Sequence, residues 1–222
     1  MFCLNSESPS PVLVFAIIAG FLELYSEGFM TQSERQIFLI KELISEKNEY
    51  KNIQIPSDDA QQKILLRSLM NIREAKNADK KFLEIQDEYL QEELMQKGIT
   101  DINTLLQVKK NIYLWEGDIT TLKCDAIVNA ANCALAGGGG VDGAIHKAAG
   151  IELNEACMKL HECRTGDAKV TSAFNIKSSN YIIHTVGPVY QHCADDPLLL
   201  ASCYKRSLDE ALKLNLTSIG FC

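Results

Sequence analysis

The hydrophobic positions between residues 31 and 107 recur three and four apart, as in Ile37, Ile40 and Ile44. This period puts apolar side chains on one face of a helix, and the segment is expected to form three or four short helices. Pro-Ser-Asp-Asp at residues 56–59 predicts a helix start, and Lys97-Gly98 predicts a helix end. Such stripes usually face a core, so we favour a helical layer packed on the rest of the protein over a partner-binding module.

After Lys109 and Lys110 the pattern changes to short apolar runs that alternate with helical stretches. We expect strands at residues 111–115, 125–129, 170–176, 181–186 and 218–222, and helices at residues 141–149, 152–163 and 197–214. This alternation predicts an α/β domain with a mostly parallel sheet, in which ligands bind beyond the carboxyl ends of the strands. The chain is therefore divided into residues 1–29, a helical extension at residues 30–110 and an α/β domain at residues 111–222.

The composition changes this picture in two respects. The formal net charge of −7 disfavours a general electrostatic grip on nucleic acid or on an anionic membrane, so an anionic ligand must be held locally. The eight cysteines lack paired-motif spacing in a chain too long to need disulfides, and we expect reduced thiols in the cytoplasm.

Residues 11–22 form an apolar run like the core of a signal peptide. The ten residues before it contain no Lys or Arg, Glu23 interrupts it, and the run is too short to span a bilayer. Met30 opens the helical pattern, so one hypothesis is that residues 1–29 come from an upstream start. Secretion is not expected.

Four consecutive glycines, Gly137, Gly138, Gly139 and Gly140, precede Val141 and the helix expected there. Without side chains, a phosphate can approach successive main-chain N–H groups, and the positive end of the helix adds to the attraction. The alternative is a flexible turn, because a glycine run alone is weak evidence.

Three polar residues lie in loops on the same side of the expected sheet. Asn132 and Asp142 bracket the glycine run, and together they suit orientation of sugar hydroxyls or of a water. Asp118, which we place at the end of the first strand, could accept a hydrogen bond from an exocyclic amine. Taken singly, Asn132 is equally a turn residue, Asp142 a first-turn acid and Asp118 an N-cap.

Several motifs agree in order and spacing with one family. They are Leu-Trp-Glu-Gly-Asp-Ile-Thr at residues 114–120, Asp-Ala-Ile-Val-Asn-Ala-Ala-Asn at 125–132, the glycine run through His146, Thr165-Gly166, and Ile-Ile-His-Thr-Val-Gly-Pro at 182–188. Residues 111–222 thus resemble MacroD-type macrodomains, which bind ADP-ribose in a three-layer sandwich. The resemblance implies that Asp118 and Ile119 meet the adenine, residues 137–141 hold the diphosphate, and Asn132 and Asp142 address the distal ribose.

The resemblance also implies a reaction. It would be hydrolysis of the ester between ADP-ribose and a protein carboxylate, or deacetylation of O-acetyl-ADP-ribose, with the ligand's own phosphate helping to position the water. Asn132 and Asp142 are then the candidate catalytic residues. His146 is interpreted as structural, and Cys133 as a small residue that fills space, because no histidine is near it in sequence. The alternative function is a non-catalytic ADP-ribose-binding module or an inactive fragment.

The first half resembles the helical extension of microbial protein-ADP-ribose hydrolases, at residues 55–57, 69–73, 82–93 and 98–101. Many of those proteins carry zinc ligands in the loop that here reads Ala-Gly-Gly-Gly-Gly-Val-Asp at residues 136–142. This departure predicts no zinc site, and no cofactor is expected. Cys157 and His161, four apart on one expected helical face with Cys163 nearby, lack a clear fourth ligand and are interpreted as ordinary residues.

The family pattern continues after the strand expected at residues 218–222 with a second loop, Ile-Ser-Thr-Gly followed by an aromatic residue and a glycine. That loop covers the diphosphate and the distal ribose from the opposite side. We therefore expect these residues to form the front part of the domain, with a sheet that is incomplete at the C-terminus.

Overall fold

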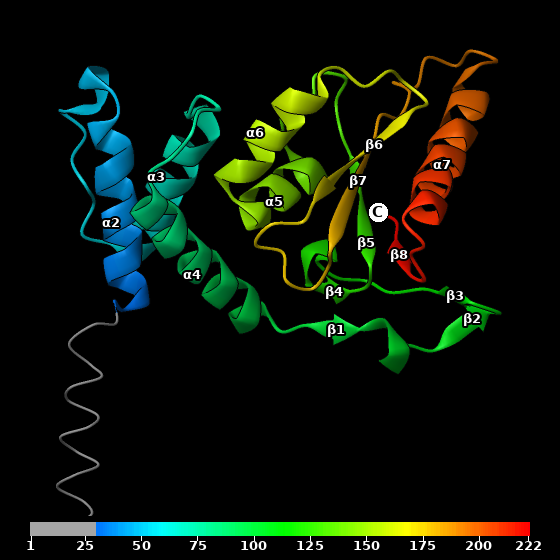
Figure 1. Cartoon of the computed structure of the whole chain (residues 1–222), viewed down its shortest axis with the longest axis horizontal. Coiled ribbons are helices and arrows are strands. Elements are labelled where there is room, and N and C mark those ends of the chain that lie inside the picture. Colours follow the sequence, from blue (N-terminus) through cyan, green and yellow to red (C-terminus); the bar gives the residue numbers. More distant parts are fainter. Residues whose placement is uncertain (1–29) are drawn as a thin grey trace, which may run out of the picture.

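A computed structural model describes residues 30–222 of the chain (Figure 1). The segment interpreted as a doubtful leader, residues 1–29, lies outside the described residues. The first elements are α2 (Gln32–Ser45), α3 (Asp59–Ile72) and α4 (Lys80–Lys97), with a short 3-10 helix, η1 (Asn48–Tyr50), after α2. Within residues 30–222, no helix has the length and apolar character needed to cross a membrane.

The ends of these helices follow from their sequences. Thr31 caps α2 in a reciprocal pair with Glu34, and Asp58 accepts from the backbone N–H of Gln61 to cap α3, as the Pro-Ser-Asp-Asp pattern predicted. Gly98 ends α4 with a φ of 79°, which confirms the second predicted boundary. The prediction that the helical pattern continues to residue 107 is wrong after Gly98. There the chain forms short strands and a 3-10 helix.

Helices α2, α3 and α4 pack on one another beside α5 and α6 (Figure 1). Their core consists of buried apolar side chains from all three helices, together with Ile151 from the following part of the chain. We expected the helical segment to pack on the rest of the protein, and the shared Ile151 confirms it. The domain boundary at residues 110 and 111 stays a prediction.

The second half holds a four-stranded sheet in the order β6-β7-β5-β8. Strand β5 (Ala126–Ala130) runs parallel to β7 (Tyr181–Thr185) and to β8 (Ile219–Gly220), whereas β6 (Ala168–Ser172) is antiparallel to β7. The mostly parallel sheet predicted from the alternating pattern is therefore confirmed.

Helices cover both faces of this sheet. On one face, α5 (Gly140–Ala149) and α6 (Ile151–Leu160) pack on Ile127 and Ile182. On the other face, α7 (Asp196–Lys213) packs its Ala211 near Val128 and Ile183. Alternate residues of β5 and β7 thus face opposite cores, as the period of two along a strand requires. The three-layer arrangement (Figure 1) confirms the predicted fold class.

Several boundaries differ from the predictions. The strand expected at residues 111–115 is reduced to β3 (Ile112–Tyr113), which pairs only with β2 (Gln107–Lys109), away from the main sheet. The expected strand at residues 170–176 ends at Ser172, because the chain turns there and Phe174 has a φ of 50°. The helix expected to reach residue 163 ends at Leu160, where His161 has a φ of 58°.

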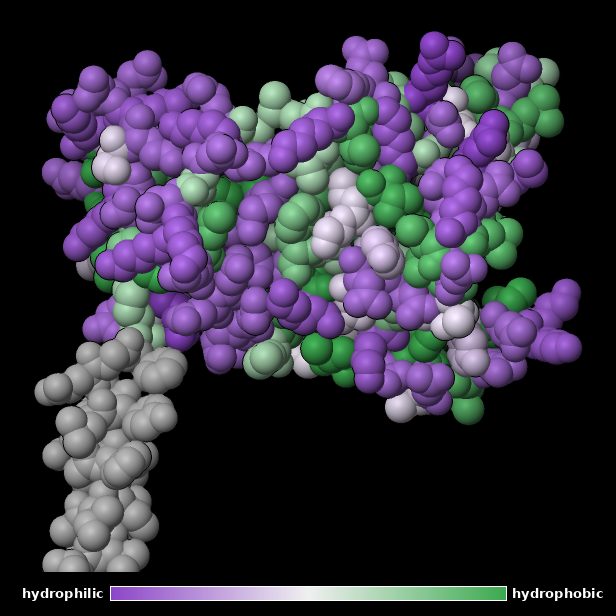
Figure 2. Space-filling view, in the orientation of Figure 1, coloured by the Kyte–Doolittle hydropathy of each residue, from purple (hydrophilic) through white to green (hydrophobic). Residues whose placement is uncertain are grey.

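Between α4 and β5 lie the remaining short elements. They are β1 (Thr100–Asp101), the 3-10 helices η2 (Ile102–Thr104) and η3 (Ile119–Thr121), and β4 (Leu122–Lys123), which pairs in parallel with β1. In the space-filling view (Figure 2), the helical part is mostly hydrophilic, whereas hydrophobic residues gather over the α/β part.

Candidate functional site

The glycine-rich loop connects the carboxyl end of β5 to the first turn of α5. Gly137 and Gly140 have φ values of 74° and 58°, a backbone conformation that other residues adopt only with strain. A side chain at Gly143 would also be excluded, because an added Cβ would lie 2.4 Å from the carbonyl oxygen of Gly138. The loop is therefore packed directly on the first turn of α5, as the strand-loop-helix prediction required.

The N-terminus of α5 is open to a ligand. Its N-cap residue is Gly139, and no side chain in the described part of the chain caps the helix. The first backbone N–H groups of a helix lack partners within the helix and carry partial positive charge. This end of α5 is suited to bind an anionic group such as a phosphate.

Asn132 stabilises the loop by two hydrogen bonds. Its Nδ2 donates to the carbonyl oxygen of Gly137 over 2.8 Å, and its Oδ1 accepts from the backbone N–H of Ala136 over 3.2 Å. The residue is nevertheless exposed. Its amide is thus held in place at the surface, which combines the turn role with access for a ligand.

Asp142 is buried, with 6% of its surface exposed. Its Oδ1 accepts a 2.7 Å hydrogen bond from Nδ2 of Asn129, a fully buried residue of β5. A Cβ added to Gly138 would lie 3.2 Å from Oδ2 of Asp142 and 3.9 Å from Nδ2 of Asn132. The structure therefore brings Asn132 and Asp142 together at Gly138.

A buried polar network supports Asp142 from beneath. The same Nδ2 of Asn129 lies 3.1 Å from Nδ1 of His184 on β7, and Nε2 of His184 lies 2.9 Å from the hydroxyl of Thr171 on β6. Burial, and then the neighbouring His146, lower the pKa of His184 to about 3, so this imidazole is neutral at neutral pH. The network links β5, β6 and β7 to α5. Its neutral histidine, His184, places no second charge beside Asp142.

His146 on α5 completes this network on its other side. Its Nδ1 lies 2.6 Å from Oδ1 of Asn154, and its Nε2 lies 3.5 Å from Oδ1 of Asp142. This Nε2 is buried without a hydrogen-bond partner among the described residues. The interpretation of His146 as structural omitted its contact with Asp142, which follows from their spacing of four on one helix.

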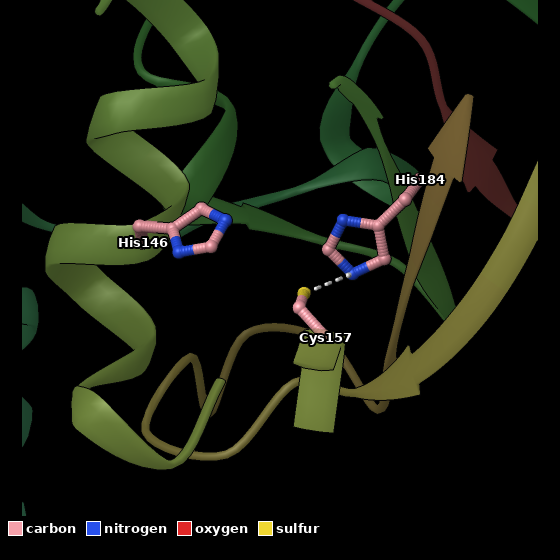
Figure 3. A group of neighbouring side chains, drawn as sticks. All are labelled: His146, Cys157 and His184. Carbon is pink, nitrogen blue, oxygen red and sulfur yellow. Dashed lines mark hydrogen bonds between the residues drawn. The ribbon is translucent and has the colours of Figure 1, made fainter. Parts of the chain in front are cut away.

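His146, Cys157 and His184 form a buried cluster in which one ring nitrogen of each histidine and the cysteine Sγ lie within 4.8 Å of one another (Figure 3). These residue types could hold a metal, but ligands of one zinc ion lie within about 4 Å of each other. Nε2 of His184 already contacts Thr171, and burial, followed by the charge of Asp142, raises the pKa of the Cys157 thiol to about 12. The absence of zinc stays a prediction.

The pair Cys157 and His161 is not brought together on one face. Cys157 points into the core toward His184, with 3.9 Å between Sγ and Nε2 (Figure 3). His161 is exposed beyond the end of α6. The spacing argument failed because α6 ends one residue before His161.

Asp118 lies before η3 rather than at the end of a strand. Its Oδ1 accepts from the backbone N–H and the hydroxyl of Thr120, and its Oδ2 accepts from Nζ of Lys97 over 2.8 Å. Burial raises the pKa of Asp118, but these hydrogen bonds outweigh it and lower the pKa overall. The N-cap alternative is therefore confirmed, and Ile119 beside it is buried in the core against α5.

Sequence reasoning missed Asn129, Thr171 and His184. A signal existed for Asn129, because it is a polar residue inside the apolar run of a buried strand, where an unpaired amide would be costly. No comparable signal existed for the contacts of His184, which depend on the pairing of β5, β6 and β7.

Comparisons with known proteins place the chain among macrodomain proteins. A family profile described as Macro domain matches residues 128–222. A protein-ADP-ribose hydrolase of Treponema medium is 46% identical over 209 residues, which cover 87% of this chain and 80% of that protein. The ADP-ribose glycohydrolase MACROD1 of Mus musculus is 50% identical over 117 residues, which cover 52% of this chain and 36% of that protein.

Among solved structures, the macrodomain of Trypanosoma brucei in complex with ADP-ribose is similar in fold. Its TM-score is 0.53 and its identity 34%, and the match covers 70% of this chain and 72% of that one. The chain spans 36% to 64% of the length of mouse MACROD1 and six further curated relatives, so it matches only part of each.

Proposed function

We propose that this chain, which belongs to the macrodomain family, binds ADP-ribose at the loop between β5 and α5 and hydrolyses the bond joining it to a protein. The observation that carries the proposal is the convergence of Asn132 and Asp142 on Gly138, at the uncapped N-terminus of α5. This arrangement places an exposed amide and a fixed carboxylate beside an anion-binding helix end. ADP-ribose presents a sugar next to a diphosphate, which matches that order of groups.

Each part of the ligand has a proposed partner. The open N–H groups of residues 137–141 would bind the diphosphate, and Asn132 would donate to a hydroxyl of the distal ribose. Asp118 would accept from the adenine amine, beside the backbone of Ile119. This last contact requires the Asp118 carboxylate to share its hydrogen bonds with Lys97 and Thr120.

The bond cleaved is proposed to be an ester to an acidic side chain, and O-acetyl-ADP-ribose would present a similar ester. Asp142 would accept a hydrogen bond from the attacking water or from the ribose, because Asn129 leaves its second oxygen facing Gly138. The water would be positioned jointly with the ligand's phosphate, so no strongly basic side chain is required.

Isothermal titration with ADP-ribose and release of ADP-ribose from a glutamate-modified protein test the proposal. Asn132→Ala is expected to lower turnover about tenfold or more, since it removes a polar contact to the ribose. Asn48→Ala, an exposed asparagine on the helical part, is the matched control and should behave as wild type. A wild-type chain that neither binds ADP-ribose nor releases it would refute the proposal.

The alternative, a binding module without activity, has one observation in its favour. Asp142 is almost fully buried, and Asn129 occupies its Oδ1. ADP-ribose binding by the wild type, with no turnover above that of Asp142→Asn, would favour this alternative.

A cytoplasmic location is also proposed. It is supported by the seven cysteines of residues 30–222, all of which are free thiols. Fractionation of cells that express the full chain would test it, and recovery in the secreted fraction would contradict it.

A further inference from the structure

A cavity of about 240 Å³ lies between the helical part and the glycine-rich loop. Arg67 and Asn71 of α3 line one side, and Gly137, Gly138 and Asn154 line the other. The cavity is therefore built by both halves of the chain, and it shares its loop residues with the proposed ADP-ribose site.

Arg67 is the charged residue of this cavity. It is half-buried, and its Nη2 donates to the carbonyl oxygen of Gly143 over 2.8 Å. No carboxylate lies within ion-pair distance of Arg67 in residues 30–222. A half-buried guanidinium that has a neutral partner and no anion keeps N–H donors available, and burial lowers its pKa.

The contact of Arg67 brings its charge close to the proposed reaction site. Gly143, which it contacts, packs against the carbonyl oxygen of Gly138. Gly138 is also the residue at which Asn132 and Asp142 converge. An anion in the cavity would therefore lie beside the distal ribose rather than beside the adenine.

We propose that this cavity holds the carboxyl group of the protein side chain that carries ADP-ribose, as an ester before hydrolysis and as a carboxylate after it, with Arg67 as its anchor. This inference rests on the proposed function, because it names the substrate's protein side. A guanidinium binds a carboxylate by two parallel hydrogen bonds, and the amides of Asn71 and Asn154 supply further donors. The helical part would then be a wall of the substrate site.

The chemistry of the proposed reaction creates an anion at this place. Hydrolysis of the ester consumes one water and yields a ribose hydroxyl, a side-chain carboxylate and a proton. Negative charge therefore develops on the protein side of the broken bond. A fixed guanidinium beside that side stabilises the charge as it forms.

A titration monitored by NMR tests the cavity directly. N-acetylglutamate amide should shift the Arg67 Nε–Hε signal and the amides of Gly137 and Gly138, whereas neutral N-acetylglutamine amide should not. The shifts of the Gly137 and Gly138 amides should disappear in Arg67→Gln, which removes the charge. Absence of shifts in the wild type would overturn the inference, and so would inorganic phosphate acting at lower concentration than the glutamate.

A kinetic comparison gives a second readout. Arg67→Gln should lower kcat/KM for a glutamate-modified protein about tenfold or more, through kcat, since the guanidinium acts on charge that develops only as the ester breaks. Its affinity for free ADP-ribose and its thermal unfolding should match those of Arg35→Gln, which alters an arginine paired with Glu88 on the helical part. A parallel loss of ADP-ribose affinity would assign Arg67 to the ligand's phosphates and overturn the carboxylate assignment.

The two proposals fail in different ways. A wild type that neither binds ADP-ribose nor releases it refutes the proposed function, and the glutamate titration still decides whether the cavity binds a carboxylate. Normal ADP-ribose binding with unchanged kinetics in Arg67→Gln refutes only the role of the cavity.

Discussion

Asn129 Nδ2 lies 2.7 Å from Asp142 Oδ1, so a hydrogen bond between two buried side chains joins the end of β5 to the first turn of α5. The same Nδ2 contacts Nδ1 of His184. Strand β5 thus holds in place the Asp142 carboxylate, which we propose lies beside the distal ribose of ADP-ribose. Because Asp142 lies two residues after Gly140, the first residue of α5, this bond also fixes where the helix begins relative to the sheet.

Replacement of Asn129 by Ala should lower the free energy of unfolding by about 1–3 kcal/mol, because it leaves the buried Asp142 carboxylate without its donor. Urea unfolding followed by circular dichroism measures this change. Asn48→Ala, at an exposed asparagine, should leave the free energy unchanged. Equal stability of the two variants would mean that the bond contributes little.

Two glycines of the loop and of α5 should differ in how much their replacement by Ala lowers the unfolding free energy. Gly143→Ala places a Cβ 2.4 Å from the carbonyl oxygen of Gly138 and should cost about 1–3 kcal/mol of unfolding free energy. Gly139→Ala meets no atom within 4 Å and should lower the unfolding free energy by less, because its penalty is only that Ala is a poorer N-cap residue than Gly. Similar melting temperatures for both variants would contradict the close packing of the loop on α5.

Acid should destabilise the protein through His184. Its pKa is about 3 in the folded protein against 6.5 unfolded, so below pH 6.5 the unfolded chain binds the extra proton. Stability from the neutral imidazole is complete above pH 6.5 and decreases toward pH 3, by about 2 kcal/mol between pH 7.5 and 5.0.

Urea unfolding at both pH values, compared with His184→Gln, tests this effect. The comparison is needed because burial raises the pKa of Glu152. This carboxyl group makes the folded protein more stable as the pH falls, and it does so equally in the wild type and in the variant. The variant should be less stable at pH 7.5 but should lose less on acidification. If the unfolding free energy of the variant fell by as much as that of the wild type between pH 7.5 and 5.0, groups other than His184 would cause the acid sensitivity.

Docking of the helical part should depend on Gln86. This buried side chain accepts from the backbone N–H of Ile151 over 3.0 Å and donates to Glu152 over 2.8 Å. Gln86→Ala should therefore cost about 1–3 kcal/mol of unfolding free energy. Gln96→Ala, exposed on the same helix, should cost less than about 0.5 kcal/mol. Urea unfolding distinguishes them, and equal values would argue against this contact.

Iodoacetamide should distinguish the cysteines. Cys133 is exposed and should be alkylated in the native protein at pH 8, whereas Cys157 should not, because it is buried and its pKa is raised to about 12. Peptide mapping by mass spectrometry measures both. Rapid alkylation of Cys157 would indicate that the core around α6 opens.

Local patterns predicted much of this fold. The acids at Asp58 and Asp59, and Gly98 after Lys97, marked helix ends because capping depends on neighbouring residues. The alternation of strands and helices predicted the layers. Residues 111–115 failed as a strand of the main sheet, because an apolar run does not reveal which strand it pairs with.

The part of the site that depends on residues near one another in sequence was predicted, and the part that depends on tertiary packing was not. The glycine loop with Asn132 and Asp142 is local in sequence, and the structure brings these residues together at Gly138. Arg67 is 76 residues from Gly143, whose carbonyl oxygen it contacts, and His184 is 55 residues from Asn129. Such contacts depend on tertiary packing, and no periodicity in the sequence indicates them.

Gly150 ends α5, and α6 begins directly after it, while Gln86 of α4 fills the space beside its Cα. A Cβ there would lie 2.8 Å from Nε2 of Gln86, and the φ of 92° already disfavours any other residue. Position 150 should therefore remain glycine during evolution even in a lineage that shortens the glutamine, because more room does not relieve the strained backbone. The corner between α5 and α6 is fixed by the backbone at Gly150, and Gln86 packs against it.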